Sequence, residues 1–124
     1  MKRHLLTFVA LVCSLMVSAY EFEHNLIYYN ITSPSTVEVT YSNYREYEGD
    51  VNIPVAVSFA GRAYYVTSIG NSAFSGCSSL TSVTFPVGLA SIGDFAFRGC
   101  SSLTSVTLPA GLTRIKGWAF EDCL

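Results

Sequence analysis

Apolar residues recur along the second half of the chain with a fixed period of 23 residues. Residues 68–90 have the sequence SIGNSAFSGCSSLTSVTFPVGLA, and residues 91–113 have the sequence SIGDFAFRGCSSLTSVTLPAGLT. The two segments align without a gap, and residues 114–124, RIKGWAFEDCL, begin a third copy. Self-similarity at such a period is typical of a stacked architecture, in which each copy forms one coil of a solenoid.

A diverged first coil is expected before these copies, at residues 51–67. VNIP at 51–54 corresponds to VTFP at 83–86, and VTSIG at 66–70 corresponds to LASIG at 89–93, where the second full copy begins. The segment between these two anchors is longer than in the later copies. Its SFAGRAYYV sequence predicts a β-hairpin around Gly61.

Within one copy, the LTSVTFP segment predicts a short strand that pairs in parallel with its neighbours. Side chains alternate between the two faces of a strand, so Val83 and Phe85 should share the inner face. Pro86 ends the strand because it has no N–H for a ladder. The DFAFRGC segment predicts a compact helical or 3₁₀ turn. The polar outer face of the strands is formed by Ser82, Thr84, Ser105 and Thr107.

Equivalent side chains of stacked coils should lie above one another, because neighbouring strands are about 4.8 Å apart. The predicted ladders are Phe74, Phe97 and Phe120 on one line, and Ile69, Ile92 and Ile115 on another.

Three cysteines, Cys77, Cys100 and Cys123, recur with the same period beside the phenylalanine ladder. Free cysteine often packs as a small buried hydrophobe, so we expect a buried, reduced ladder. One oxidised pair of adjacent rungs stays open as an alternative. The chain lacks the close-spaced cysteine pairs or histidine partners of a metal site.

The pattern AFxxCxxLxxVxxPxGLxxIG resembles the BspA-like leucine-rich repeats found in surface proteins of anaerobic bacteria and some protozoa. The resemblance covers residues 68–124, and the segment from Phe22 to Thr67 is similar to the N-terminal cap of that family. It implies a right-handed leucine-rich-repeat solenoid with an N-terminal β-cap. It also implies adhesion at the cell surface or after secretion, with host matrix or plasma proteins as typical ligands.

Members of that family usually carry many more repeats and a C-terminal attachment segment. This chain ends inside a repeat, at Leu124. A fragment, a truncated gene and a short paralogue are all compatible with such an end.

The first 19 residues predict a signal peptide. Lys2 and Arg3 precede an apolar run at residues 5–17, LLTFVALVCSLMV, followed by small residues before Tyr20. This run is shorter than the roughly 20 residues of a membrane span and suits the apolar region of a signal peptide. We therefore expect a mature chain that begins at Tyr20, has no membrane span, and is secreted or displayed at the cell surface.

Residues 20–50 predict a β-cap over the first coil. EHNLIYYNI and TVEVTYS predict two strands joined around Ser33–Ser35. Tyr41, Tyr44 and Tyr47 continue into an acidic loop. The alternative is an aromatic binding patch in this loop, since tyrosine is enriched at interfaces. A glycosylation sequon, Asn30-Ile31-Thr32, also lies in this region.

Composition and motifs argue against nucleic-acid binding and catalysis. Only 13% of the residues are charged and the formal net charge is −2, so no basic patch is evident. Beyond the expected signal peptide, His24 is the single histidine, and the serines belong to the CSSLTS repeat. No nucleophile elbow, phosphate-binding loop or metalloprotease motif occurs. We expect no enzyme activity, no cofactor and no metal.

Candidate binding residues are those that vary between copies, because ladder positions are constrained by stacking. Ser72, Phe95 and Trp118 form the most variable column, and Ser75, Arg98 and Glu121 form a second. An exposed Phe above a Trp would suit an interaction hot spot. The outer strand face of Ser82, Thr84, Ser105 and Thr107 is the other candidate surface.

The expected function is protein–protein binding, with adhesion to host matrix or plasma proteins as its specific form. A structural spacer without a ligand and a carbohydrate-binding module remain as alternatives. Self-association through the open C-terminal coil is also expected, because an open coil exposes strand edges and apolar side chains.

Overall fold

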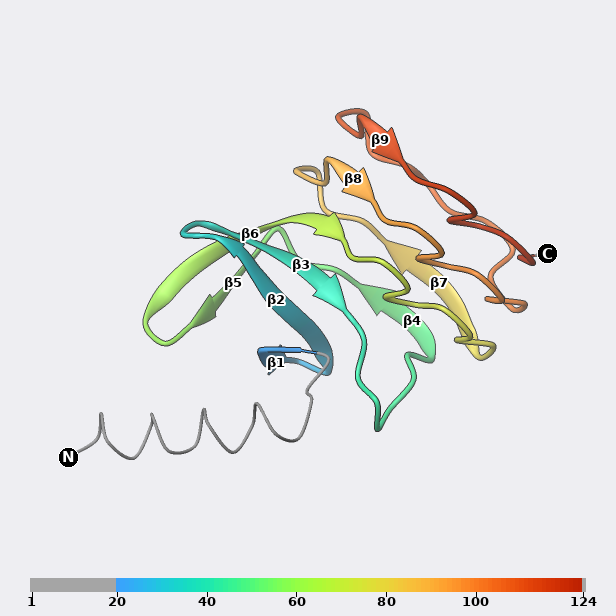
Figure 1. Ribbon diagram of the computed structural model, residues 1–124, viewed down its shortest axis with the longest axis horizontal. Coiled ribbons are helices and arrows are strands. Elements are labelled where there is room, and N and C mark those ends of the chain that lie inside the picture. The colour runs from blue at the N-terminus through green and yellow to red at the C-terminus, as the bar shows by residue number, and fades with distance from the viewer. Residues whose placement is uncertain (1–19, 124) are drawn as a thin grey trace.

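The computed structural model describes residues 20–123, so the expected signal peptide at 1–19 lies outside the described part (Figure 1). Its strands are β1 (Phe22–His24), β2 (Ile27–Ser33), β3 (Thr36–Thr40), β4 (Gly49–Asn52), β5 (Ala56–Phe59), β6 (Arg62–Ile69), β7 (Leu80–Thr84), β8 (Ser91–Ile92) and β9 (Arg114–Ile115). Turns and loops join these strands, and residues 20–123 contain no helix, hence none that could cross a membrane.

The N-terminal strands form antiparallel hairpins. β1 pairs with β2, and β2 pairs with β3 across a short turn after Ser33, as expected. The prediction of one continuous strand over EHNLIYYNI is wrong, because the chain turns back at Asn25 and Leu26. Both residues have positive φ angles, 49° and 67°, as a tight hairpin turn requires. The turn places Phe22 opposite Tyr29.

One line of parallel pairing runs from the N-terminal hairpins into the repeats. β3 pairs with β6, β6 with β8, and β8 with β9. Ile69 faces Ile92, and Ile92 faces Ile115, which confirms the alignment of the copies. The hairpin around Gly61 is also confirmed, since β5 pairs antiparallel with the first part of β6.

A second, two-stranded sheet joins β4 to β7 in parallel. Val51 faces Val83, as the alignment of the diverged coil predicts. The expected strand of the next copy is wrong, because residues 103–107 form no strand. Leu103 is buried, but this segment makes no ladder with β7 in the described part of the chain, and a strand requires a hydrogen-bonded neighbour.

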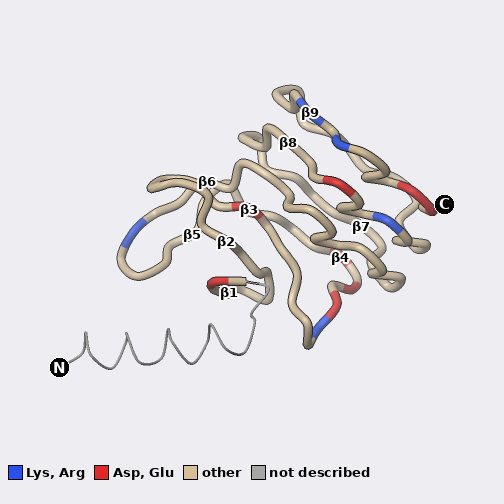
Figure 2. The backbone as a smooth tube through the Cα atoms, viewed as in Figure 1, with Lys and Arg blue, Asp and Glu red and all other residues tan. Residues whose placement is uncertain are grey.

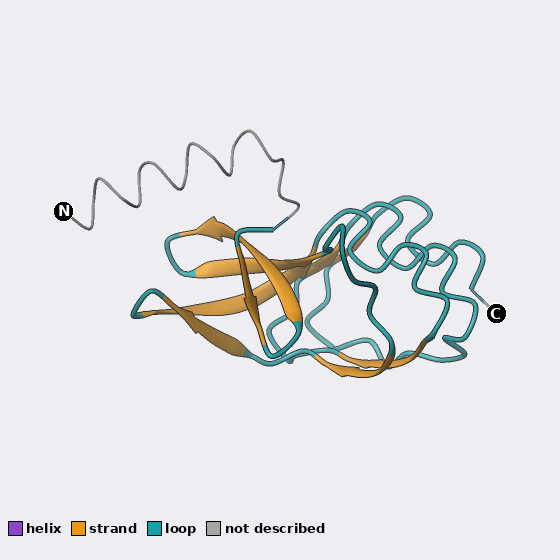
Figure 3. Cartoon of the chain, turned by 90° about the horizontal axis from the view of Figure 1, so that it is seen from below, coloured by secondary structure: helices purple, strands orange, loops and turns teal. Residues whose placement is uncertain are grey.

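The turns after β6 and β8 are not helical, contrary to the prediction. Alternate N–H groups of the first turn donate to carbonyls of the next coil: Ser72 to Asp94, Phe74 to Ala96 and Gly76 to Arg98, at 2.7–2.9 Å. A helix would use these N–H groups for carbonyls four residues back along its own chain. The coils therefore hold each other through their turns, which Figure 3 shows as a stack of similar loops.

The predicted phenylalanine ladder is confirmed. Phe74 and Phe97 stack with ring centroids 4.7 Å apart, and Phe97 and Phe120 with centroids 5.1 Å apart. Tyr47 extends the ladder, because its ring lies 4.4 Å from that of Phe74. Its hydroxyl donates to the Thr40 carbonyl and accepts from the N–H of Tyr28. The residue before the repeats thus occupies a rung of the same stack.

The isoleucine ladder is buried at its first two rungs. Ile69 and Ile92 are almost completely buried, whereas Ile115 is 45% exposed. β9 lies at the end of its sheet, so this side chain has a neighbouring coil on one side within the described residues.

Candidate functional site

The two variable columns form one surface, which we call the turn face and define as Ser72, Phe95, Trp118, Ser75, Arg98 and Glu121. The rings of Phe95 and Trp118 are stacked, with centroids 5.4 Å apart and planes inclined by 8°. Trp118 is 64% exposed, and Phe95 is half-buried. The structure therefore brings together the aromatic pair that the alignment of copies singles out.

Arg98 links the two columns. Its guanidinium lies 5.4 Å from the centroid of the Phe95 ring, and its Nε lies 2.9 Å from Oε1 of Glu121. The ring and the carboxylate hold an otherwise flexible cation beside the aromatic pair. An arginine in this arrangement can offer its remaining N–H donors to a partner.

The backbone at the first column is unusual for the residues that occupy it. Ser72, Phe95 and Trp118 have φ angles of 60°, 57° and 55°. This left-handed conformation favours Gly and Asn and is rare for bulky side chains. At the first two positions the conformation accompanies hydrogen bonds between coils: the N–H of Ser72 donates to the carbonyl of Asp94 at 2.9 Å, and the N–H of Phe95 to that of Gly117 at 3.0 Å.

A ladder of short polar side chains precedes this column. Oδ1 of Asn71 accepts from the N–H of Asp94 at 2.8 Å, and Oδ1 of Asp94 accepts from the N–H of Gly117 at 3.0 Å. These bonds fix the backbone immediately before Phe95 and Trp118. The aromatic side chains are thereby presented from a rigid support.

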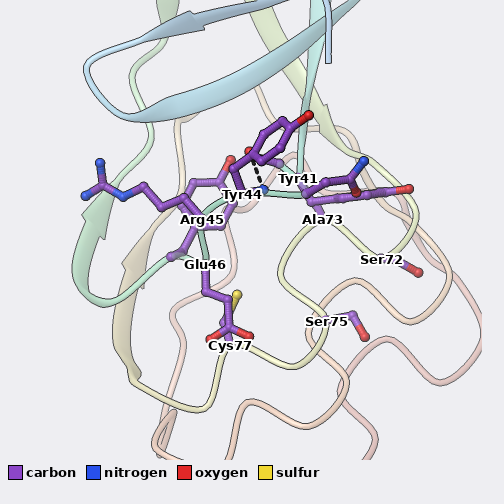
Figure 4. A pocket seen from close by; sticks show the side chains of 11 residues that line it. Tyr41, Tyr44, Arg45, Glu46, Ser72, Ala73, Ser75 and Cys77 are labelled. Carbon is purple, nitrogen blue, oxygen red and sulfur yellow. Dashed lines mark hydrogen bonds between the residues drawn. The ribbon is translucent and has the colours of Figure 1, made fainter. Parts of the chain in front are cut away.

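A pocket of about 420 Å³ adjoins the turn face at its N-terminal side (Figure 4). Its walls are the 41–47 loop and the turn after β6, and its lining includes Tyr41, Tyr44, Glu46, Ser72 and Ser75. Tyr44 is 83% exposed and Tyr41 41% exposed, whereas Tyr47 is buried. The sequence indicated an aromatic loop here but gave no sign of a pocket, because the loop has no counterpart in the aligned copies.

The candidate strand face is only partly assembled. Ser82 and Thr84 lie on β7, where Oδ1 of Asp50 accepts hydrogen bonds from the hydroxyls of Ser82, at 2.7 Å, and Thr81, at 3.1 Å. These bonds hold the pKa of the Asp50 carboxyl below its ordinary value. Ser105 and Thr107 lie outside any strand. The expected continuous polar sheet of four residues is therefore wrong.

Charged residues of both signs are spread over several parts of the described chain. Figure 2 shows both signs of charge on the loop between β3 and β4 and on the coils that carry β8 and β9. Among the described residues, no three His, Cys, Asp or Glu side chains are close enough together to hold a metal ion.

The cysteine ladder is buried at Cys77 and Cys100 and half-buried at Cys123, and all three are free thiols. The thiol of Cys100 donates to the carbonyl of Phe74, and that of Cys123 to the carbonyl of Phe97, both at 3.0 Å. Burial raises the pKa of the Cys100 thiol to about 12. A group so strongly protonated is a poor nucleophile and fits a packing role.

Comparisons with known proteins agree with this architecture. Residues 63–124 match the model of the BspA type leucine-rich repeat region, in six copies. Comparison with curated proteins gave no match.

Three solved structures are similar to the chain. A leucine-rich repeat protein from Bacteroides ovatus is 34% identical, with a TM-score of 0.67. A leucine-rich cell surface protein from Faecalibacterium prausnitzii is 26% identical, with a TM-score of 0.73. The T. pallidum leucine-rich repeat protein is 27% identical, with a TM-score of 0.63.

The similarity covers 84%, 86% and 82% of this chain respectively. It covers 33%, 29% and 45% of those three chains. The matched part of this chain therefore spans less than half of each of these three structures.

Proposed function

The chain belongs to the family of BspA-type leucine-rich repeat proteins, and from this premise we propose that it is a protein-binding module whose contact surface is the turn face. One observation carries the proposal: the fold imposes a left-handed backbone at Phe95 and Trp118, yet both positions carry stacked aromatic side chains. Gly or Asn would satisfy that backbone at lower cost.

The side chains of the turn face have the chemistry of an interaction hot spot. Trp and Arg dominate such sites, and both Trp118 and Arg98 contact the ring of Phe95. Strained residues persist where the surrounding structure holds them, and they cluster at functional sites. The strand face lacks aromatic side chains and is interrupted at residues 103–107, so it is the weaker candidate.

We further propose the setting in which this surface acts. The first 19 residues serve as a signal peptide, and the mature protein is secreted or displayed on the cell surface for adhesion to host matrix or plasma proteins. The apolar run at residues 5–17 supports export, and one similar structure is described as a cell surface protein.

The proposed architecture is a right-handed solenoid at residues 51–124 with an N-terminal β-cap at residues 20–50. Two contacts support the cap: β3 pairs with β6 as β6 pairs with β8, and Tyr47 stacks on Phe74. The exposed Ile115 of the edge strand β9 supports self-association. Sedimentation of a clean monomer at high concentration would contradict self-association.

The proposed function is tested by binding of the full chain to a panel of matrix proteins, plasma proteins and glycans. Phe95→Asn and Trp118→Asn remove each ring while keeping a residue that tolerates the backbone. We expect saturable binding to a protein, weakened about tenfold or more by either change. Thr84→Ala and Thr107→Ala are matched controls on the strand side and should have no effect.

The other outcomes have distinct meanings. Loss of binding in the strand-side variants alone would place the binding site on the strand face and not on the turn face. Binding to glycans alone would favour a carbohydrate-binding module. No binding by a folded chain would favour a structural spacer.

A further inference from the structure

The pocket beside Ser72 lies at a break in the aromatic column of the turn face. Ser72, Phe95 and Trp118 occupy equivalent positions in successive coils, with the same left-handed backbone. The second and third positions carry stacked rings, whereas the first carries only a hydroxymethyl group. The neighbouring column shows the same change, since Ser75 stands where the next coil has Arg98. Two small side chains thus leave space where later coils place bulky ones.

Aromatic side chains limit this space on its other side. β3 pairs with β6 in the same parallel sense as β6 pairs with β8, so the 41–47 loop follows β3 as the 71–76 turn follows β6. Tyr41 and Tyr44 line the pocket from this loop, and Ser72 and Ser75 line it from the turn (Figure 4). The tyrosines occupy the side of Ser72 opposite to Phe95.

The spacing of the stacked rings indicates what kind of group would fill the space over Ser72. Equivalent rings of successive coils stack with centroids 4.7–5.4 Å apart. A ring placed over Ser72 would therefore continue the stack of Phe95 and Trp118 at an ordinary aromatic separation. The volume of about 420 Å³ is within the range of small-ligand pockets.

The polar atoms of the pocket select the kind of ring. Ser72 and Ser75 contribute hydroxyls, the carboxylate of Glu46 contributes acceptors only, and Asn43 and Arg45 add donors at the rim. Tyr and Trp combine a flat apolar body with an O–H or N–H donor that needs a partner when buried. Phe and Leu would bring no donor of their own to the Glu46 carboxylate or the serine hydroxyls.

We propose that the pocket between the 41–47 loop and Ser72 receives a Tyr or Trp side chain of the protein ligand, which completes the aromatic column. This inference rests on the proposed function, because it assigns a subsite to the same binding surface. The ligand ring contacts the loop tyrosines on one side and lies over Ser72 on the other, in line with Phe95 of the next coil. Its donor faces Glu46 and the serine hydroxyls.

The test uses acetylated, amidated pentapeptides Gly-Ser-X-Ser-Gly, with X as Trp, Tyr or Leu, together with simple methyl glycosides. Saturation-transfer NMR on the full chain detects even weak binding through signals of the probe. We expect ring signals from the Trp and Tyr peptides, and much weaker signals from the Leu peptide and the glycosides. Preferred binding of glycosides, equal binding of the Leu peptide, or no binding by any probe would overturn the proposal.

Ser72→Phe supplies the missing ring from the chain itself. It should abolish peptide binding while the melting temperature is kept or raised, because the new ring stacks on Phe95. Ser58→Phe, which adds the same ring on the exposed strand β5, is the matched control and should bind as the native chain does. Undiminished binding by the Ser72→Phe variant would contradict the proposed subsite.

A second variant keeps the test decisive if Ser72→Phe fails to fold. Tyr41→Ala removes one wall and should weaken peptide binding about three- to tenfold, the value of one aromatic contact. A protein ligand that binds Ser72→Phe and Tyr41→Ala normally, but not Trp118→Asn, would refute the subsite and leave the proposed function standing.

Discussion

At the scale of single residues, the position of Ser72, Phe95 and Trp118 combines two opposing requirements. All three residues have a positive φ, which costs a bulky residue about 1–2 kcal/mol. Stacking of Phe95 on Trp118 returns about 0.5–1.5 kcal/mol. The two contributions nearly cancel, so stability alone does not explain why aromatic residues stand here.

This balance predicts how substitution affects stability. Phe95→Asn or Trp118→Asn should change the free energy of unfolding by no more than about 1 kcal/mol, because relief of backbone strain offsets the lost stacking. Phe97→Ala truncates a buried ring of the phenylalanine ladder, two residues after Phe95. It should lower the free energy of unfolding by about 3–5 kcal/mol. Urea denaturation of the three variants measures both values. A cost of Trp118→Asn as large as that of Phe97→Ala would mean that the exposed ring is structural.

The buried thiol predicts a pH dependence. The pKa of Cys100 rises from 9.0 to about 12 on burial, so the unfolded chain loses this proton at lower pH than the folded chain. The stabilisation is complete below pH 9 and is lost as pH rises toward 12. Burial also raises the pKa values of Tyr29 and Tyr47 from 10.0, which steepens the loss above pH 10.

Urea midpoints at several pH values from about 8 to 11 test this dependence. Cys100→Ala should lower stability at neutral pH but flatten the fall that begins near pH 9. An equally steep fall in the native chain and in this variant would contradict the assigned burial of the thiol.

At the scale of elements, stacking of turns replaces the helices expected from the DFAFRGC pattern. The pattern places Phe97 and Cys100 inward in either structure, so it could not distinguish a helical turn from the observed one. The choice depends on donors used between coils, such as the N–H of Phe97 to the carbonyl of Ala119. Hydrogen bonds of that kind leave no periodic signal in a single copy.

The close approach of successive turns explains why position 93 is occupied by glycine. A Cβ on Gly93 would lie 2.5 Å from Oδ1 and 2.7 Å from the backbone N of Asn71 in the preceding coil. Gly93→Ala should therefore destabilise the protein by about 1–3 kcal/mol, as overpacking does. Gly88→Ala is the matched control, because a Cβ there meets no atom within 4 Å.

Thermal and urea unfolding of the two glycine variants measure this difference. The prediction is contradicted if both variants are equally stable.

The sequence predicted those features that depend on periodicity. It gave the register of Val51 with Val83, the phenylalanine ladder and the hairpin at Gly61. It also singled out Phe95 and Trp118 as candidate binding residues, because the side chain at their position changes from copy to copy whereas those at the ladder positions do not. It missed the turn at Asn25 and Leu26, since that pair lacks the glycine that usually marks such a turn. The pocket was missed because tertiary contact of the non-repeated 41–47 loop creates it.

At the scale of the whole molecule, the positions that repeat between coils form a rigid interior, and the positions that vary form the proposed binding surface. Aromatic stacking runs from Tyr47 to Phe120 through the interior. Outside it, the columns that vary carry Phe95, Trp118 and Arg98, and the pocket adjoins them at Ser72. Recognition by this protein is therefore expected along its turns, next to the 41–47 loop.

The most direct measurement of this claim is hydroxyl-radical footprinting of the full chain with and without the protein ligand that the binding panel identifies. Trp118 and Tyr44, 64% and 83% exposed in the free chain, should lose reactivity in the complex. Tyr65 and Val87, which are exposed at 59% and 77% and lie outside the turn face and the pocket, should keep theirs. Protection of Tyr65 or Val87 with unchanged Trp118 and Tyr44 would contradict the account.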